Sequence, residues 1–494
     1  MSPQVSIPFN ILPEFDELHV ISDLHLGGDE PSRQIFNAGA EAEWLIDHLT
    51  AEPPGKRIAL LINGDLVDFL AEKDAVCFDP SGAVEKLKRI AGDNSFKPVW
   101  EALKRFVQKK GRRLIINLGN HDVELALPWV RESLLRILTA DDEAARGRIV
   151  LSFEGAGFLC RVGNATILAV HGNEVDDWNV TDHEKIRRMG RDIMHGLQVE
   201  SWIPNAGTQL VIDVMNDLKH IYPFIDLLKP EIPGVVPTVL ALAPDQRDKV
   251  FAAARTARRL VWDKIKRSTG FLGAAEDSPA GGWPVRSTSS MALSIDSRDR
   301  AEILMREAED RMRLHVEPMS LVVSDEQGGY LGGFTALRKF VQKQSRSEVL
   351  REALEGLRQD VSFELKAEDD TYKNLDRQVG EEIDFVVAGH THLERALKRK
   401  QGKGFYFNTG TWVRLIRLER SLLESEEKFE QVFETFKKKS MEALDSFEGL
   451  ILRRLAVASF RVEGETTTGE IRHVVPQPGG PAFAEVPGSR FIRA

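Results

Sequence analysis

The chain of 494 residues contains only two cysteines, Cys77 and Cys160. Two cysteines are too few for a disulfide framework or for a metal site built from several thiolates. Both lie in apolar surroundings, where a buried free thiol is common. We therefore assign them no chemistry.

Long apolar runs are also missing. No uninterrupted apolar stretch reaches the length of a membrane-spanning helix. The first ten residues, MSPQVSIPFN, lack the charged segment and apolar core of a secretory signal. We therefore expect a cytoplasmic protein without an integral membrane segment.

The chain has no excess of basic charge. It carries 66 Lys and Arg residues against 76 Asp and Glu residues, which gives a formal net charge of −10. A protein that coats nucleic acid neutralises phosphates with Lys and Arg, so this balance disfavours such a surface. Local basic patches are compatible with it, and nucleic acid is therefore disfavoured as a partner without being excluded.

The positive features begin with alternating strand-like and helix-like segments. Apolar runs typical of strands at 18–22, 58–62 and 113–118 alternate with helical patterns at 33–50 and 96–110. This alternation predicts an α/β layered core. Gly163-Asn164, between two further apolar runs, predicts a hairpin. The later strand-like runs lie at 384–388, 403–419, 454–462 and 469–475.

The segment between His171 and His390 has a different character. Helical patterns recur there, and Pro223 should kink or interrupt the first of them. The patterns lie at 209–228, 245–266, 298–313 and 333–358, with a Pro/Gly/Ser-rich linker at 268–290. We therefore predict a first core part at 1–175, a mostly helical insertion at 176–380, and a second core part at 381–494 with a small helical excursion at 422–447.

Five short motifs follow apolar runs and carry most of the chemistry. They are DLH at 23–25, GD at 64–65, GNHD at 119–122, HG at 171–172 and GHTH at 389–392. Loops at one edge of a sheet can gather these motifs around a metal centre. The candidate metal ligands are Asp23, His25, Asp65, Asn120, His171, His390 and His392.

The mixture of ligands indicates the class of metal and of reaction. Nitrogen and oxygen donors without thiolate suit Mn, Fe or Zn better than Ca, or Mg alone. Two divalent ions bring four positive charges, of which Asp23, Asp65 and a bridging hydroxide would remove three. The remaining charge suits a phosphate oxygen. Two ions about 3.5–4 Å apart also lower the pKa of bound water, so we predict a dinuclear hydrolase whose nucleophile is hydroxide.

Three neighbouring residues have expected supporting roles. His121 follows candidate ligand Asn120 and is placed to protonate the leaving oxygen or to stabilise charge on the phosphoryl oxygens. Asp68 and Asp122 are expected to orient the imidazoles of the ligands.

The ordered set DLH, GDLVD, GNHD, HG and GHTH resembles the calcineurin-like metallophosphoesterase superfamily over about residues 18–175 and 383–475. The resemblance implies a sandwich of two β-sheets flanked by helices, a catalytic His121 and a bridging Asp65. It also implies a metal-dependent phosphoric ester hydrolase with two divalent ions, of which Mn is preferred and Fe or Zn are alternatives. It places Asp23, His25 and His392 on one ion, and Asn120, His171 and His390 on the other.

Departures from the family pattern narrow the range of expected substrates. Ser/Thr protein phosphatases of this superfamily usually read GDxVDRG and GNHE, whereas here Phe69-Leu70 follows Asp68 and the later motif ends in Asp122. The hydrolases of a UDP-diacylglucosamine lipid precursor are similar in DLHL and GHTH, but commonly carry Arg at the position of His121. We expect a small phosphodiester, pyrophosphate or phosphomonoester. A nuclease of the same superfamily and a non-catalytic scaffold that uses the insertion for protein contacts are the alternatives.

Other features have two interpretations. Residues 174–179 either reach the substrate or cap a helix that starts near Asp182. Three arginines lie close together in the sequence: Arg187, Arg188 and Arg191. We favour a solvated helix face for them over a binding site for a second phosphate. A basic cluster at 395–403 either steers the substrate or protects a sheet edge. The apolar stripe at 211–225 is favoured as core packing over a lid for an acyl chain.

Overall fold

The computed structural model describes part of the chain. The described residues are 11–493 except 54, 74, 177–178, 200, 206–207, 209–218, 220, 230–237, 239–240, 243–344, 355–361 and 419. The predicted helices at 245–266 and 298–313 and the linker at 268–290 lie outside the described residues. Most of the predicted helix at 209–228 also lies outside them.

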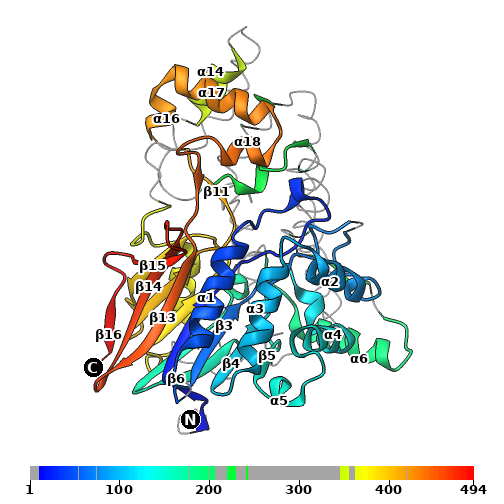
Figure 1. The fold of residues 1–494 in the computed structure, drawn as a ribbon. Coiled ribbons are helices and arrows are strands. Elements are labelled where there is room, and N and C mark those ends of the chain that lie inside the picture. Colours follow the sequence, from blue (N-terminus) through cyan, green and yellow to red (C-terminus); the bar gives the residue numbers. More distant parts are fainter. Residues whose placement is uncertain are drawn as a thin grey trace, which may run out of the picture.

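Two large β-sheets pack face to face and carry helices on their outer faces, as the resemblance implied (Figure 1). The strand order of one sheet is β15 (Ala482–Glu485), β14 (Thr466–Val475), β13 (Ala456–Glu463), β2 (Glu17–Ile21), β3 (Ile58–Asn63), β4 (Arg112–Asn117) and β5 (Ile149–Ser152), and β16 (Phe491–Arg493) also pairs with β14. The order of the other is β1 (Glu14–Phe15), β6 (Phe158–Val162), β7 (Ala165–Ala169), β8 (Phe385–Ala388), β10 (Phe405–Thr409) and β9 (Glu394–Lys398).

Strand β3 shows why the central strands are apolar throughout. Leu60 and Ile62 face the layer of outer helices, whereas Ala59 and Leu61 face the second sheet, and all four are fully buried. A strand that is covered on both faces reads as a continuous apolar run. Cys160 of β6 lies in the same layer between the sheets, where burial raises the pKa of its thiol.

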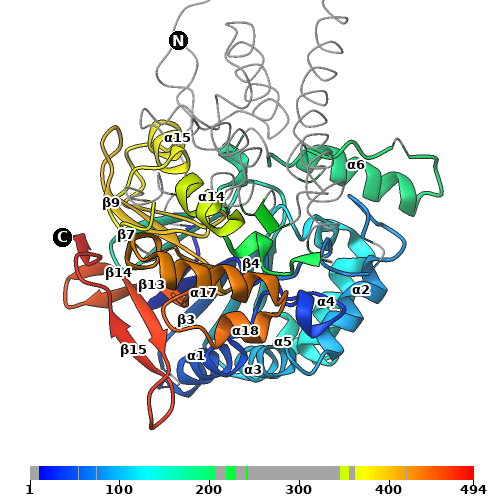
Figure 2. The same cartoon turned by 90° about the horizontal axis from the view of Figure 1, so that it is seen from above.

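Helices cover both outer faces of the sandwich (Figure 2). The first sheet is covered by α1 (Gly39–Ala51), α2 (Ala83–Gly92), α3 (Lys97–Gln108), α4 (Pro128–Thr139) and the short α5 (Glu143–Arg146). Helix α15 (Asp370–Gln378) packs Tyr372 and Leu375 onto β8 of the second sheet. Although α15 falls inside the predicted insertion, it packs as a layer of the core. The boundaries at 175 and 380 stay a prediction.

Some elements differ from the predicted ones. Helix α1 begins at Gly39 and not at residue 33, because Phe36 pairs with Val413 across an isolated β-bridge. The predicted hairpin at Gly163-Asn164 is confirmed by the antiparallel strands β6 and β7. Strand β9 was not predicted, since its sequence ERALK is mostly polar.

A second apolar core lies apart from the sandwich, at the top of Figure 1. It joins α14 (Arg346–Ala353), α16 (Arg420–Glu424), α17 (Glu426–Lys437), α18 (Met441–Asp445) and the 3-10 turn Ile225–Leu227. The short pair β11 (Leu415–Ile416) and β12 (Ile451–Leu452) leads into it. Described parts of the insertion and the helical excursion therefore share one core, which we call the helical cap.

The ring of Phe224 stacks on Phe436 in this cap, with the ring centroids 4.8 Å apart. Helical backbone ends at Ile221, two residues before Pro223, as expected from the position of this proline.

Among the described residues, no helix is both long enough and apolar enough to cross a membrane.

Candidate metal centre

The predicted ligands lie at one edge of the sandwich because of the strand directions. Strands β2, β3 and β4 run parallel and in register, so the loops that follow them meet at the same edge. These loops carry Asp23, His25, Asp65 and Asn120, all at most 7% exposed. Strands β7 and β8 are also parallel to each other and deliver His171, His390 and His392.

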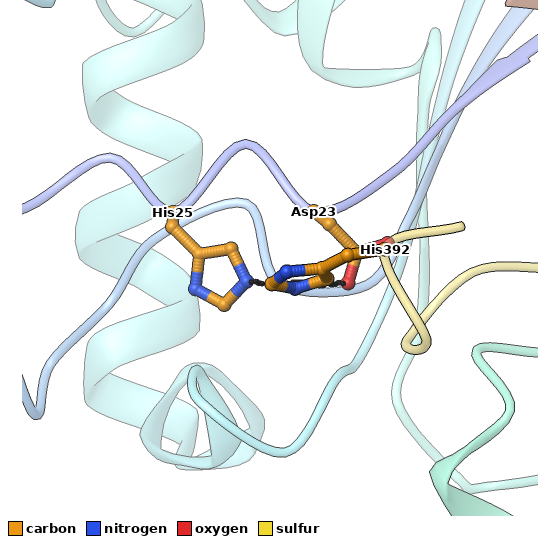
Figure 3. Close-up of side chains that lie close together, drawn as sticks. All are labelled: Asp23, His25 and His392. Carbon is orange, nitrogen blue, oxygen red and sulfur yellow. Dashed lines mark hydrogen bonds and ion pairs between the residues drawn. The ribbon is translucent and has the colours of Figure 1, made fainter. Parts of the chain in front are cut away.

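Asp23, His25 and His392 point toward one another (Figure 3). Nε2 of His392 lies 3.3 Å from Oδ1 of Asp23 and 3.1 Å from Nε2 of His25. Burial lowers the pKa of His392 to about 4, to which the positive charge of Lys229 contributes. A neutral imidazole can offer its lone pair to a cation, so these three residues fit a metal ion.

Asp65 lies between two groups of possible ligands. Its Oδ2 atom is 3.6 Å from Nε2 of His25 and 3.2 Å from Nε2 of His171. Asp23, Asp65 and His171 form a second cluster of the kind that can hold an ion. A carboxylate in this position can bridge two cations.

Four buried atoms of predicted ligands lack a hydrogen-bonding partner within the described part of the chain: Nδ1 of His25, Nδ1 of His392, Oδ1 of Asn120 and Nε2 of His171. The last two belong to the second predicted ion site. Nε2 of His171 lies 3.2 Å from Oδ2 of Asp65 as an ion-pair contact. Nδ1 of His171 lies 2.7 Å from the carbonyl oxygen of Asn63 and donates to it, so a neutral His171 carries its lone pair on Nε2. Burial lowers the pKa of His171, but the charge of Asp65 outweighs burial and raises it to about 10 in the absence of a cation. Burying an unsatisfied polar atom costs about 1–3 kcal/mol, so Oδ1 of Asn120 and Nε2 of His171 fit a bound cation.

The backbone of the motifs is strained where the predicted ligands lie. Five of them have left-handed backbone conformations, with φ between 47° and 69°: Asp23, His25, Asp65, His390 and His392. Such conformations are uncommon for residues other than glycine, cost of order 1–3 kcal/mol each, and concentrate at functional sites.

Two motif glycines permit close approach of the loops. A Cβ atom on Gly64, which has a φ of +88°, would lie 2.3 Å from Nδ1 of His171. A Cβ atom on Gly119 would lie 2.1 Å from Oδ1 of Asp65. Any side chain at these positions would displace a predicted ligand.

His121 forms a third cluster of the kind that can hold an ion with His25 and Asp68, and its side chain is 20% exposed. Its Nδ1 atom is 3.3 Å from Oδ1 of Asp68, and the other oxygen of Asp68 is 3.5 Å from Nδ1 of His25. Burial lowers the pKa of His121, but the charges of Asp68 and Asp65 outweigh burial and raise it to about 9. Bound cations would oppose that rise. The position of Asp68 agrees with its expected role of orienting imidazoles.

Asp122 binds the backbone of two motif loops. Its carboxylate accepts hydrogen bonds from the backbone N–H groups of Leu66 and Gly119, at 2.8 and 2.7 Å. It therefore joins the loops after β3 and β4 and so fixes their spacing. Each oxygen of Asp122 accepts from one backbone amide. The expectation that Asp122 orients an imidazole stays a prediction.

His390 lies outside the three clusters found among the described residues. Its ring centroid is 5.4 Å from that of His171, and its Nε2 atom is 2.8 Å from Oδ2 of Asp176. Its backbone N–H donates to both oxygens of Asp23, at 3.2 and 3.0 Å. The role of His390 as a metal ligand stays a prediction.

Asn63 and Asn117 were not selected from the sequence, although they support the site. Asn63 donates from its side chain to the carbonyl oxygen of Val170, and its own carbonyl accepts from His171. Asn117 in turn donates to the side-chain oxygen of Asn63 at 2.7 Å. Both are buried amides that end apolar strands, Asn63 one residue and Asn117 two residues before a motif, which is the sequence signal that would have found them.

The predicted basic clusters are mostly structural. Arg187 pairs with Glu184 of α6 (His183–Met194) at 2.7 Å on an exposed face, as favoured from the sequence. In the cluster at 395–403, Arg395 and Arg399 are buried and bind Asp369 and Asp376 at 3.0 and 3.2 Å. These two arginines attach α15 to β9 and to the residue that follows it.

Residues 18–222 match the model of the calcineurin-like phosphoesterase family. The matched span contains the first four motifs, and His390 and His392 lie beyond it. A search of curated proteins found no significant match.

Proposed function

We propose that the protein is a hydrolase of a small phosphodiester, pyrophosphate or phosphomonoester, with two divalent metal ions as cofactors. The match of residues 18–222 to the model of the calcineurin-like phosphoesterase family supports this proposal. Mn is the preferred metal, with Fe or Zn as alternatives. A cytoplasmic location is part of the same proposal.

The observation that carries the proposal is the position of Asp65. Its Oδ2 atom lies within 3.6 Å of imidazole nitrogens from both predicted ion sites, those of His25 and His171. The unpartnered oxygen of Asn120 supports the second ion site. The carboxylates, imidazoles and amide oxygen match the donor set of a Mn, Fe or Zn pair.

The chain's own residues supply orientation and proton transfer. Two bound ions would lower the pKa of a shared water and attract the phosphoryl oxygens. His121, whose ring is held by Asp68 at 3.3 Å, is placed to donate its proton to the leaving oxygen. Asp122 keeps the loops of Asp65 and Asn120 together through the amides of Leu66 and Gly119.

The helical cap supports a small substrate, because it approaches the predicted site. The backbone N–H of Lys229 donates to the carbonyl oxygen of Ile416. The segment that leads to Ile416 begins at Trp412, whose backbone N–H donates to the carbonyl oxygen of Asp23. Lys229 is 9% exposed, and its positive charge contributes to the lowered pKa of His392. The positive charge of Lys219 likewise acts to lower the pKa of His121. The insertion therefore brings positive charge to the site, which suits a phosphorylated ligand of limited size.

The test is hydrolysis of an aryl phosphodiester by metal-depleted protein to which Mn²⁺ is returned. We expect turnover that needs the metal, and loss of it in Asp65→Ala. His121→Ala should lower kcat by about 10²–10⁴-fold, as removal of a general acid does. Arg187→Ala, on the exposed face of α6, is the control and should keep the parental rate.

Two results would contradict the proposal. Bound metal without turnover on any phosphoester would favour the scaffold alternative. Cleavage of oligonucleotides with a steep dependence on salt, and no activity on small esters, would favour the nuclease.

A further inference from the structure

Asp176, just after the HG motif, holds the ring of His390. Its Oδ2 atom accepts a hydrogen bond from Nε2 of His390 at 2.8 Å. The Asp176 side chain is 26% exposed and that of His390 is 10% exposed, so the contact lies at the rim of the predicted metal centre.

The loop that carries Asp176 is closed by its own hydrogen bonds. The side chain of Asn179 donates to the same Oδ2 atom at 2.7 Å, and the backbone N–H groups of Asn179 and Val180 donate to the carbonyl of Asp176 at 3.1 and 2.9 Å. Asn173 donates from its side chain to the carbonyl of Asn179 and to Oγ1 of Thr181, both at 3.1 Å. The position of the Asp176 carboxylate is therefore fixed by its own loop.

This contact determines which nitrogen of His390 is available. A neutral imidazole that donates from Nε2 carries its lone pair on Nδ1. His171 has the opposite arrangement, because its Nδ1 atom donates to the carbonyl of Asn63 and its lone pair is on Nε2. Each of the two histidines is thus held in one tautomer by a separate acceptor.

We propose that Asp176 is a positioning residue that presents His390 to a metal ion through Nδ1, and thereby sets the affinity of the ion that His390 shares with Asn120 and His171. The inference rests on the proposed function. Acceptors that bind the far nitrogen of a ligand histidine orient the ring and increase its basicity. Because residue 176 is also the first of the predicted insertion, this contact links the insertion to one of the two ions.

The test is a titration of metal-free full-length protein with Mn²⁺, read by calorimetry and by the electron paramagnetic resonance signal of a coupled Mn pair. The parent should bind two ions. Asp176→Ala should weaken one of them by about 10–100-fold and remove the coupled signal at limiting metal, while the other ion keeps its affinity. Asp176→Asn keeps an acceptor oxygen and should restore most of the lost affinity.

Asp182→Ala is the matched control. Asp182 lies in the same segment and accepts from the backbone N–H of Lys185 at 2.8 Å, where it caps α6. Its replacement should leave both ions bound as in the parent.

Three outcomes would overturn the inference while the parent still binds two ions. Parental affinity for both ions in Asp176→Ala would remove the role of Asp176. Equal weakening of both ions, with a lower melting temperature than Asp182→Ala, would make the role purely structural. Tighter binding would mean that Asp176 competes with the ion for His390. A parent that binds fewer than two ions would instead contradict the proposed function itself.

Discussion

At the scale of single residues, the protein concentrates unfavourable features where its predicted ligands lie. His392 has a φ of 61° and a ring nitrogen 3.1 Å from that of His25. The sequence predicts which residues gather but not their backbone angles, because the loop geometry depends on contacts between strands that are far apart in the chain. The left-handed backbone of His392, a predicted ligand, is therefore known only from the structure. It affects the stability of variants at this position, which can be measured.

Replacement of His392 separates backbone strain from metal binding. Asn tolerates the left-handed conformation, so His392→Asn should unfold within about 1 kcal/mol of the parent when metal is absent. It should gain less stability from Mn²⁺, because a lost ligand weakens the binding that stabilises the native state. His392→Val should be less stable than His392→Asn by about 1–3 kcal/mol, since a β-branched residue resists this conformation. Thermal unfolding with and without Mn²⁺ measures both effects. Equal stabilisation of parent and His392→Asn by Mn²⁺ would contradict the assignment.

Glu17 gives a prediction about pH at a position remote from the metal centre. Burial raises the pKa of Glu17, but hydrogen bonds with His19 and Lys56, at 3.1 and 2.7 Å, outweigh it and lower the pKa to about 2. A carboxyl group with a lowered native pKa stabilises the fold above its ordinary pKa of 4.5, and this stabilisation is lost as the pH falls toward 2.

Glu17→Gln should therefore be less stable than the parent at pH 7 by about 1 kcal/mol, after allowance for solvent screening. The difference should shrink between pH 4.5 and pH 2. Urea unfolding at a series of pH values measures it. A difference that is constant over this range would show that the charge of Glu17 contributes nothing.

At the scale of elements, the sequence predicted those strands that are buried on both faces. Strands β2, β3, β4, β7 and β8 are of this kind, and their loops carry the motifs. Strand β9 was missed because its buried Arg395 is satisfied by Asp369, an ion pair that no local pattern reveals. The helical insertion and the helical excursion were predicted, but their shared core was not, since it joins segments that are distant in the chain.

Phe436 tests whether the cap is one unit with the insertion. Its ring stacks on Phe224 and is fully buried. Phe436→Ala should destabilise the cap by about 3–5 kcal/mol, the usual cost of removing a buried aromatic ring. We expect faster proteolysis in residues 219–229, with the sandwich still folded. KM for a small ester should rise because Lys219 and Lys229 lose their positions. Unchanged cleavage and an unchanged KM would separate the cap from the substrate site.

At the scale of the whole molecule, a two-sheet sandwich brings five distant loops to one edge, and the helical cap approaches the same edge. The order of the motifs predicted the match of residues 18–222 to the calcineurin-like phosphoesterase family, whereas the ligand set stays a prediction. The sequence did not predict the supporting contacts of Asn63, Asn117 and Asp122, because each depends on the spacing between loops. It also did not reveal which residues of the cap approach the site.

The central claim is that Asp65 bridges two metal ions. Crystals grown with Mn²⁺ and measured at the manganese absorption edge test it directly. The account predicts two anomalous peaks about 3.5–4 Å apart, with the Asp65 carboxylate between them. A single peak, or two peaks that Asp65 does not join, in protein that hydrolyses a phosphoester would contradict it.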